Sequence, residues 1–403
     1  MSDVLIDRAG ERGRAGGLTS TLVLALGTFA VGTDAFVVAG FLPSMARTLH
    51  VSAGAAGQSV TVFAVAYAVL APVLATATAR LPRRTLLVGA LVVLGLANLA
   101  SALAPDLPLL IASRVLAAAG AAVYTPGAGA VSAALVRAEV RARALAVVVG
   151  GLTVATAIGV PLGDLAGHWF GWRTALGLVA ALSLVAAAGV SLIMPSLPGG
   201  PRVPLRTRLA LLRRPAVASV LPLTVLGMGA SYTVYAYSVP ALKGVGVPEG
   251  SMVLMLFLYG AGAVAGNLVA GYATDRWGPM RVLSGGYLVL TASLAALGIV
   301  AATGAGSAPA AGALVLLWGA STWTQTPPQQ HRLIAAAPQE APLAVSLNAS
   351  SIYVGIGAGT ALGGATLGAG PSVTYGLAAV VAALAWGFLR WTGRGAGVRD
   401  GGR

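Results

Sequence analysis

Two residues of this chain could carry proton or ion-pair chemistry inside long apolar runs. Asp34 lies in the run 18–42, and Arg114 lies in the run 108–133. If both runs cross a membrane, Asp34 lies roughly 13 Å and Arg114 roughly 9 Å below the same surface, at a rise of about 1.5 Å per residue. A carboxylate at such depth costs roughly 2.5–3.5 kcal/mol, so it needs a partner or a function. We predict that the two side chains meet and that Asp34 takes up and releases a proton, with a static pair that only orients the helices as the alternative.

A second acid lies near the end of another apolar run. Asp164 follows Gly163 in the run 144–167, and His168 comes one helical turn later. Because imidazole titrates near neutral pH, the two groups could relay protons towards the membrane interior. We predict a proton-coupling role for Asp164, with a solvated helix end as the alternative.

Aromatic and amide side chains supply candidate contacts for a small molecule. Gln325 and Gln329 follow Trp318 by seven and eleven residues, so one helix would place each of them within about 20° of Trp318 on one face. Groups of this kind suit a flat or polyhydroxylated neutral solute. Ordinary hydrogen bonding between helices, or anchoring at a membrane surface, is the alternative. The predicted substrate contacts are Tyr232, Tyr235, Trp318, Gln325, Gln329, Asn348 and Tyr353.

Composition identifies the elements that must position these residues. Hydrophobic residues make up 57% of the 403 positions and charged residues 9%, whereas soluble domains carry about 25% charged residues. At roughly 20 residues per span, we predict an all-α integral membrane protein with twelve transmembrane helices in two six-helix, pseudo-symmetric bundles. The predicted spans are 18–42, 55–79, 85–104, 108–133, 144–167, 174–195, 216–240, 251–274, 282–303, 309–331, 342–367 and 371–391.

The net charge of +14 follows the pattern of a membrane protein. All Lys and Arg residues except Arg47, Arg114, Arg173 and Lys243 fall in segments that face one side of the membrane. Cytoplasmic loops carry such an excess of basic residues. We therefore predict both termini in the cytoplasm, a location in the cell membrane in contact with lipid, and no nucleic-acid partner.

A Pro- and Arg-rich stretch at 196–215 divides the apolar runs into two sets of six. A weak repeat supports duplication, because Arg80 and Arg84 after the second run correspond to Arg276 and Arg281 after the eighth. In duplicated transporters the substrate site lies between the halves, near the bilayer midplane. The predicted parts are the tail 1–17, the bundle 18–195, the linker 196–215, the bundle 216–391 and the tail 392–403.

Five motifs carry a resemblance to a known family, at 32–43, 113–120, 159–163, 170–173 and 271–281. The loop from Gly271 to Arg281 contains Asp275, Arg276 and Gly278 at the spacing Gly-x-x-x-Asp-Arg-x-Gly-x-x-Arg, which resembles the signature of the major facilitator superfamily. The sequence Gly159-Val-Pro161-Leu-Gly163 resembles the Gly-Pro motif of the antiporter branch. The first-half copy of the loop has Ala79 where the signature places Asp. If that acid stabilises the outward-facing conformation in relatives, this chain must stabilise that conformation in another way or rely on Asp275.

Together these motifs resemble the twelve-span drug:proton antiporters, in particular actinomycete chloramphenicol-resistance exporters and bacterial sugar and purine efflux proteins. The resemblance implies roles in conformational change for Arg80, Arg84, Gly159, Pro161, Gly163, Gly271, Asp275, Arg276, Gly278 and Arg281. It also implies alternating access by a single chain.

The sequence argues against metal, cofactor and enzyme chemistry. Cysteine is absent, the three histidines are scattered, and no Gly-x-x-x-x-Gly-Lys-Ser/Thr loop for ATP occurs. We therefore predict no metal, no cofactor and no enzyme activity, and expect a monomeric, proton-coupled exporter of drugs or small metabolites. The alternatives are an uncoupled facilitator or importer of a small neutral metabolite such as a sugar or nucleobase, and an integral-membrane enzyme.

Overall fold

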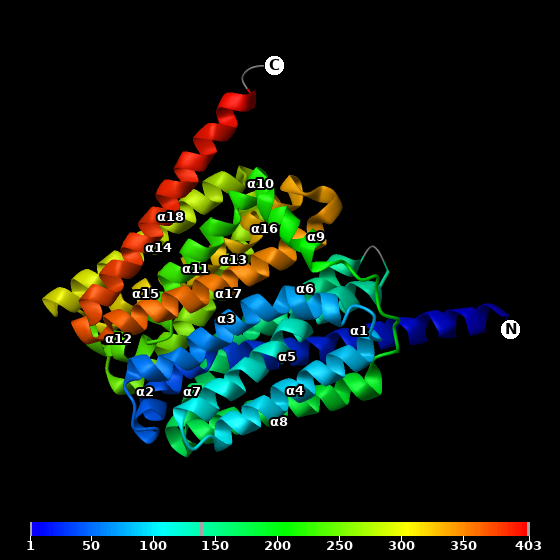
Figure 1. Ribbon diagram of the computed structural model, residues 1–403, viewed down its shortest axis with the longest axis horizontal. Helices are drawn as coiled ribbons and strands as arrows, with labels where there is room; N and C mark the ends of the chain where they lie inside the picture. Colours follow the sequence, from blue (N-terminus) through cyan, green and yellow to red (C-terminus); the bar gives the residue numbers. More distant parts are fainter. Residues whose placement is uncertain (1, 138–139, 401–403) are drawn as a thin grey trace.

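The computed structural model describes residues 2–137 and 140–400, and every regular element in those residues is helical (Figure 1). The last three residues of the predicted C-terminal tail, 401–403, lie outside this range. The N-terminal half contains α1 (Ser2–Phe36), α2 (Val38–Thr48), α3 (Ala53–Ala77), α4 (Arg83–Leu103), α5 (Leu107–Ala134), α6 (Arg141–Val154), the π-helical η2 (Ala155–Gly159), α7 (Val160–Phe170) and α8 (Trp172–Ile193).

The C-terminal half follows a linker that holds three short helices. The linker helices are α9 (Leu205–Ala210), η3 (Leu211–Arg213) and α10 (Pro215–Ala218). The C-terminal half contains α11 (Leu221–Tyr235), α12 (Ser238–Gly244), η4 (Glu249–Ser251), α13 (Met252–Trp277), α14 (Pro279–Thr303), α15 (Ala308–Thr324), α16 (Thr326–Ala336), η5 (Pro338–Glu340), α17 (Ala341–Thr366), η6 (Leu367–Ala369) and α18 (Pro371–Asp400).

Eleven helical stretches in the described residues are long and apolar enough to cross a membrane. The predicted span 309–331 is the remaining one, and it breaks at Gln325 into the two shorter helices α15 and α16. Pro327 and Pro328 explain the break, since neither has a backbone N–H to continue the helical ladder. The fold is therefore the predicted twelve-span arrangement.

Three other predicted spans also depart from a single regular helix. The first, 18–42, breaks at Val37 between α1 and α2, six residues before Pro43. The seventh, 216–240, breaks at Ala236 and Tyr237, shortly before Pro240. The fifth contains the π-helical turn η2 directly before Pro161. Helices broken at corresponding places in two repeats are typical of transporter binding sites.

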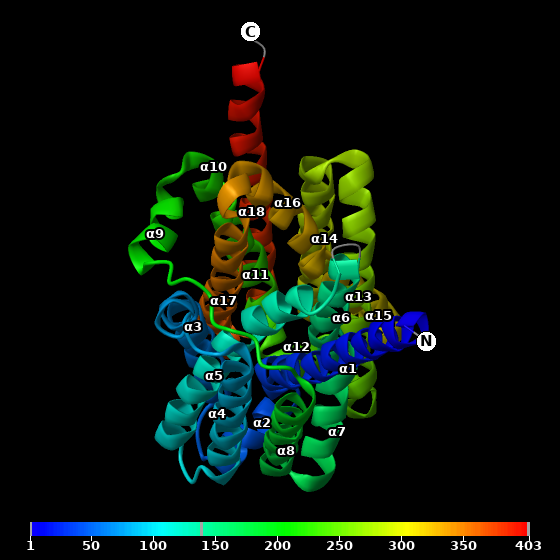
Figure 2. The ribbon, with the colours of Figure 1, turned by 90° about the vertical axis from the view of Figure 1, so that its right-hand side faces the viewer.

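The two halves repeat one packing pattern. In the N-terminal half α4 packs on α5 and α8, and α3 packs on α5; in the C-terminal half α14 packs on α15 and α18, and α13 packs on α15. Likewise α1 packs on α6, as α11 packs on α17. The halves are therefore pseudo-symmetric, and Figures 1 and 2 show them as two adjacent bundles, one blue to green and one green to red.

The halves meet along two helix pairs and at one end. The central α3 lies along α17, and α13 lies against η2 and α7. Glycine permits both approaches: a Cβ on Gly54 would lie 3.0 Å from the carbonyl oxygen of Gly364, and one on Gly260 would overlap the backbone of Thr156 and Ala157. At one end of the molecule α2 also contacts α12. We call this the α2–α12 end, and the opposite end, which carries α9 and α10, the linker end.

Candidate functional site

Asp34 and Arg114 form a buried ion pair in the N-terminal half. Arg114 Nη1 donates to Asp34 Oδ1 at 2.5 Å, and Nη2 donates to the Asp34 backbone oxygen at 3.2 Å. The two side chains are 0% and 1% exposed. Among the described residues, Asp34 Oδ2 and Arg114 Nε have no hydrogen-bond partner. The pair therefore contains a carboxylate with one buried oxygen that lacks a partner in the described residues.

The helices explain why these two groups meet. Asp34 lies in the last turn of α1, immediately before the break at Val37, and Arg114 projects from α5. Asn98 on α4 adds a distant contact, with its Oδ1 3.5 Å from Arg114 Nη1. The sequence prediction placed both charges at one depth, and the structure brings them into contact.

An aromatic chain connects this pair to the C-terminal half. The Arg114 guanidinium lies 4.6 Å from the centroid of the Phe63 ring. The Phe63 ring faces Tyr353 of α17 at 6.2 Å, and Tyr353 stacks on Tyr67 of α3 at 3.7 Å. Tyr353, a predicted substrate contact, therefore lies at the boundary between the halves. Sequence reasoning missed Phe63 and Tyr67, although both lie on one face of a predicted span, four residues apart.

A second aromatic contact crosses the boundary beside Asp34. Phe36 lies 6.1 Å from Tyr232 and 6.2 Å from Trp323, both in the C-terminal half. Within the described part of the chain, the Tyr232 hydroxyl and the Trp323 Nε1 are buried without a hydrogen-bond partner. Sequence reasoning found Tyr232 but missed Phe36 and Trp323, which lie two residues from Asp34 and Gln325, respectively.

Tyr235 and Trp318 belong to a packed cluster inside the C-terminal half. Tyr235 lies 4.5 Å from Tyr259, and Tyr259 lies 4.9 Å from Trp318 in an edge-on arrangement. Trp318 Nε1 donates to Ser231 Oγ at 2.8 Å, and Thr322 donates to the same oxygen. These contacts leave the Trp318 indole with a satisfied donor, so its environment is that of an interhelical core.

The predicted amides face α11 rather than one another. Gln325 donates to the Thr322 carbonyl at 3.0 Å and accepts from the Tyr287 hydroxyl at 3.1 Å. Gln329 donates to the Val220 carbonyl at 3.4 Å, beyond the break at Gln325. Asn348 of α17 accepts from Thr224 of α11 at 2.8 Å. All three amides are therefore engaged in helix packing.

Asp164 lies apart from the central pair, at the α2–α12 end. It lines a pocket of about 430 Å³ that α2, α7, α12 and α13 enclose. His168, Arg47, Lys243 and Glu249 line the same pocket, so Asp164 and His168 share one site as the sequence suggested. Among the described residues, no group of three or more His, Cys, Asp or Glu side chains could hold a metal ion.

The Gly-Pro motif packs the fifth span against the first. A Cβ on Gly159 would overlap Thr33 Oγ1, and one on Gly163 would overlap the Val37 side chain. Pro161 occupies the first turn of α7, directly after the π-helical turn. The motif therefore holds α7 against the break between α1 and α2, next to Asp34.

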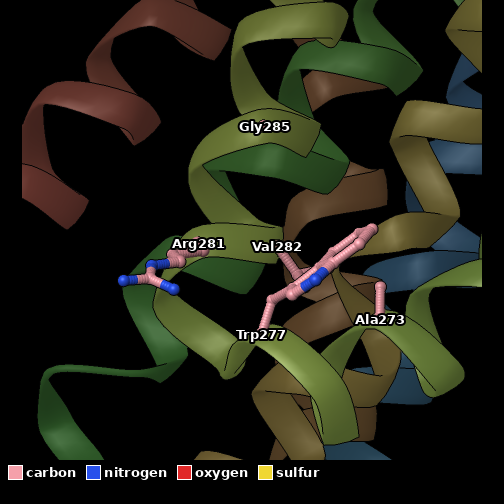
Figure 3. Close-up of a pocket in the computed structure, with 5 residues that line it drawn as sticks. All are labelled: Ala273, Trp277, Arg281, Val282 and Gly285. Atoms are coloured by element: carbon pink, nitrogen blue, oxygen red, sulfur yellow. The ribbon is translucent and has the colours of Figure 1, made fainter.

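The signature loop occupies the turn between α13 and α14. Gly278 adopts a φ of 81°, a conformation that favours glycine, and it is the N-cap residue of α14. Asp275 and Arg276 are exposed, and a Cβ on Gly271 would meet no atom within 4 Å. In Figure 3 Arg281 points away from Trp277, and the pocket between them is lined by Ala273, Val282 and Gly285. Of the three ion pairs in the described residues, none includes Asp275, Arg276 or Arg281.

The first-half loop contacts the linker. Arg83 N donates to the Leu197 carbonyl at 2.9 Å, and Gly200 N donates to the Ala79 carbonyl at 2.9 Å. Gly199 lies so close to the Arg80 backbone that a Cβ there would overlap it. Backbone contacts with the linker thus surround Ala79, where the signature places an acid.

The far end of the linker attaches to the C-terminal half. Arg214 pairs with Glu340 through two hydrogen bonds of 3.0 and 2.6 Å, which raise the pKa of the Arg214 guanidinium. Leu211 and Val217 are buried beside Leu333 and Leu347. The linker therefore contacts both halves at the linker end (Figure 2).

Sequence comparison places this chain among membrane transport proteins. The family model of the Major Facilitator Superfamily matches residues 24–341. The chain is 34% identical over 375 residues to a chloramphenicol resistance protein of Streptomyces lividans, covering 90% of this chain and 94% of that protein. It is 33% identical over 367 residues to the inner membrane transport protein YdhP of Escherichia coli, covering 90% and 93% of the two chains.

Solved structures share the fold at low sequence identity. A bacterial homologue of the human lysosomal transporter Spinster superimposes with a TM-score of 0.73 at 17% identity, over 95% of this chain and 97% of that one. A D-xylose-proton symporter also gives 0.73, at 18% identity, over 92% and 97%.

Proposed function

This chain belongs to the Major Facilitator Superfamily, and from that membership we propose that it is a proton-coupled exporter of small neutral or weakly charged molecules, chloramphenicol among them. In this proposal Asp34 carries the coupling proton, and the solute binds between the halves beside it. Both termini face the cytoplasm, so the α2–α12 end faces outwards and the linker end faces inwards.

The observation that carries the proposal is the state of the Asp34 carboxylate. It is fully buried, one oxygen is held by Arg114, and the other has no partner among the described residues. A charge buried this completely is retained only with compensation, and Arg114 supplies it. Protonation of the free oxygen would neutralise Asp34 and weaken the attraction to Arg114, while a solute that donates to the same oxygen would favour the charged form.

The coupling follows from this competition. Asp34 takes up a proton when the site opens to the outside, and it gives that proton up when a solute enters from the cytoplasm. Proton and solute therefore alternate on one oxygen and move in opposite directions.

Two features support a neutral or weakly charged solute. Asp34 is balanced by Arg114, so the pair presents no net charge to a cation. The surrounding groups, Phe36, Tyr232 and Trp323, offer aromatic surface together with an unpartnered hydroxyl and an unpartnered indole N–H. Apolar walls with a few directed polar groups are the usual composition of a small-molecule site. The name of the Streptomyces relative makes chloramphenicol the first solute to test.

Everted membrane vesicles that hold a proton gradient test the proposal, with a pH-sensitive dye as the reporter. Amphenicols, purines, sugars and other small antibiotics are added in turn to vesicles with wild-type protein, Asp34→Asn or Glu340→Gln. Glu340 is the matched control, because its carboxylate lies at the surface, far along the chain from the site. We expect at least one solute to dissipate the gradient in wild type and Glu340→Gln, but not in Asp34→Asn.

One result of this assay would contradict the proposal. A solute that crosses at the same rate in wild type and Asp34→Asn, without proton movement, would refute the proton-coupling role. The chain would then be an uncoupled facilitator with Asp34 as a structural partner of Arg114.

A further inference from the structure

We propose that the pocket at the α2–α12 end is a second solute site on the outward path, and that Asp164 is its hydrogen-bond acceptor. The pocket has a volume of about 430 Å³, within the range of about 300–1,000 Å³ typical of small-molecule sites. Its walls come from both halves, α2 and α7 on one side and α12 and α13 on the other. A solute bound there would therefore contact both halves.

Asp164 is the buried carboxylate of this pocket. It is 8% exposed, and the described residues provide it with no hydrogen bond or ion pair. Its carboxylate lies close to Gly40, where an added Cβ would be 2.8 Å from Asp164 Oδ1. A buried carboxylate without a partner is costly, and a donor on a ligand would relieve that cost.

The other charges determine which ligand fits. Lys243 and Glu249 form an ion pair of 2.5 Å and largely neutralise each other. Arg47 and Asp164 also line the pocket and carry opposite charges, and Ser44 adds a hydroxyl. An acceptor, a cationic donor and no large net charge suit a neutral molecule that carries both hydroxyl and amide groups. His168 is exposed at the same pocket and adds a further donor or acceptor.

The pocket lies close in sequence to the pair of Asp34 and Arg114. Asp34 and Gly40 are six residues apart, or roughly 9 Å at 1.5 Å per residue, and the break at Val37 separates them. A solute leaving Asp34 towards the α2–α12 end would thus meet Asp164 next. The inference rests on the proposed direction of export.

Site-directed labelling tests the pocket directly, because the natural chain contains no cysteine. Ser44→Cys places a thiol in the pocket wall, and Thr48→Cys places one at an exposed position one turn further along α2. Each variant is purified in lipid nanodiscs and labelled with a fluorescent maleimide, with and without chloramphenicol. We expect chloramphenicol to slow labelling of Ser44→Cys several-fold and to leave Thr48→Cys unchanged.

Acid variants in the Ser44→Cys background identify the acceptor. Asp164→Asn should raise the half-protecting concentration about tenfold, since a hydrogen bond to a charged group contributes at least about 1.5 kcal/mol. Asp164→Glu keeps the carboxylate and should retain protection, which separates loss of the acceptor from loss of folding. Protection should persist in Asp34→Asn, where the central site is altered.

The pocket proposal is overturned if chloramphenicol fails to protect Ser44→Cys. It is also overturned if protection is lost in Asp34→Asn but kept in Asp164→Asn, because protection would then report a change at the central site. A role of Asp164 in proton relay alone would leave protection unchanged in Asp164→Asn. The gradient assay decides the proposed function separately, since binding in nanodiscs requires no proton gradient.

Discussion

Tyr353 of α17 stacks on Tyr67 of α3, with ring centroids 3.7 Å apart and ring planes inclined by 22°. The two residues belong to opposite halves, so the stack is one of the contacts that must change if the halves move against each other. Phe63, next to Tyr353, also lies under the Arg114 guanidinium. The boundary between the halves and the buried charge pair are thus linked by direct contacts.

Replacing Tyr353 with Leu should weaken this boundary, whereas replacing it with Phe should not. An aromatic pair contributes about 0.5–1.5 kcal/mol beyond its buried area, and Phe keeps the ring. We expect Tyr353→Leu to lower the apparent Tm of the detergent-purified protein by a few degrees and to reduce solute flux in vesicles. Equal Tm values and fluxes for the Leu and Phe variants would show that the stack contributes nothing.

Removing Arg114 should be more harmful than neutralising both members of its pair. Arg114→Met leaves the Asp34 carboxylate buried and uncompensated, which costs about 3–5 kcal/mol. Asp34→Asn combined with Arg114→Met removes both charges, so it should recover most of that stability. Thermal unfolding of the wild type and the two variants measures the difference. A double variant as unstable as Arg114→Met would mean that Arg114 stabilises the fold through packing on Phe63 instead.

The contact between Asp34 and Arg114 could be anticipated from the sequence because depth in a membrane follows from residue count. The spans, the two halves and the signature loops were predictable for a similar reason: hydropathy and basic residues mark them directly. Hydropathy and basic residues do not predict how each helix is rotated about its axis. Trp318, Gln325 and Gln329 do point the same way, towards α11, where Gln325 Oε1 lies against Gly227, but the sequence did not show that other helices occupy that space.

The missed residues share a physical cause. Phe36, Phe63 and Trp323 are apolar side chains in apolar spans, and only the pairing of helices from different halves distinguishes them from lipid-facing neighbours. The breaks at Val37 and Gln325 had a signal in Pro43, Pro327 and Pro328. Proline also occurs inside unbroken helices such as α3 and α5, so proline alone did not determine which spans would break.

Tyr232→Phe should separate binding from stability. The Tyr232 hydroxyl is buried and has no partner among the described residues, so its removal should leave the Tm unchanged or raise it slightly. If a solute supplies the missing partner, the same change should raise KM for transport several-fold. Flux measured against solute concentration, with Tyr375→Phe as control, gives both quantities. Tyr375 also has an unpartnered, buried hydroxyl, but it lies on α18, away from the boundary between the halves.

Gly260→Ala should impair movement of the halves at the contact between α13 and η2. A Cβ at this position overlaps the backbone of Thr156 and Ala157, and backbone atoms cannot move aside as a flexible side chain can. We expect solute flux to fall at least tenfold while the protein still inserts and folds, because the strain is confined to the boundary between the halves. Gly89→Ala is the matched control: it lies within α4, where a new Cβ meets no atom within 4 Å. It should keep full flux and gain up to about 1 kcal/mol from helix propensity. Normal flux in Gly260→Ala would show that α13 and η2 need not approach this closely during transport.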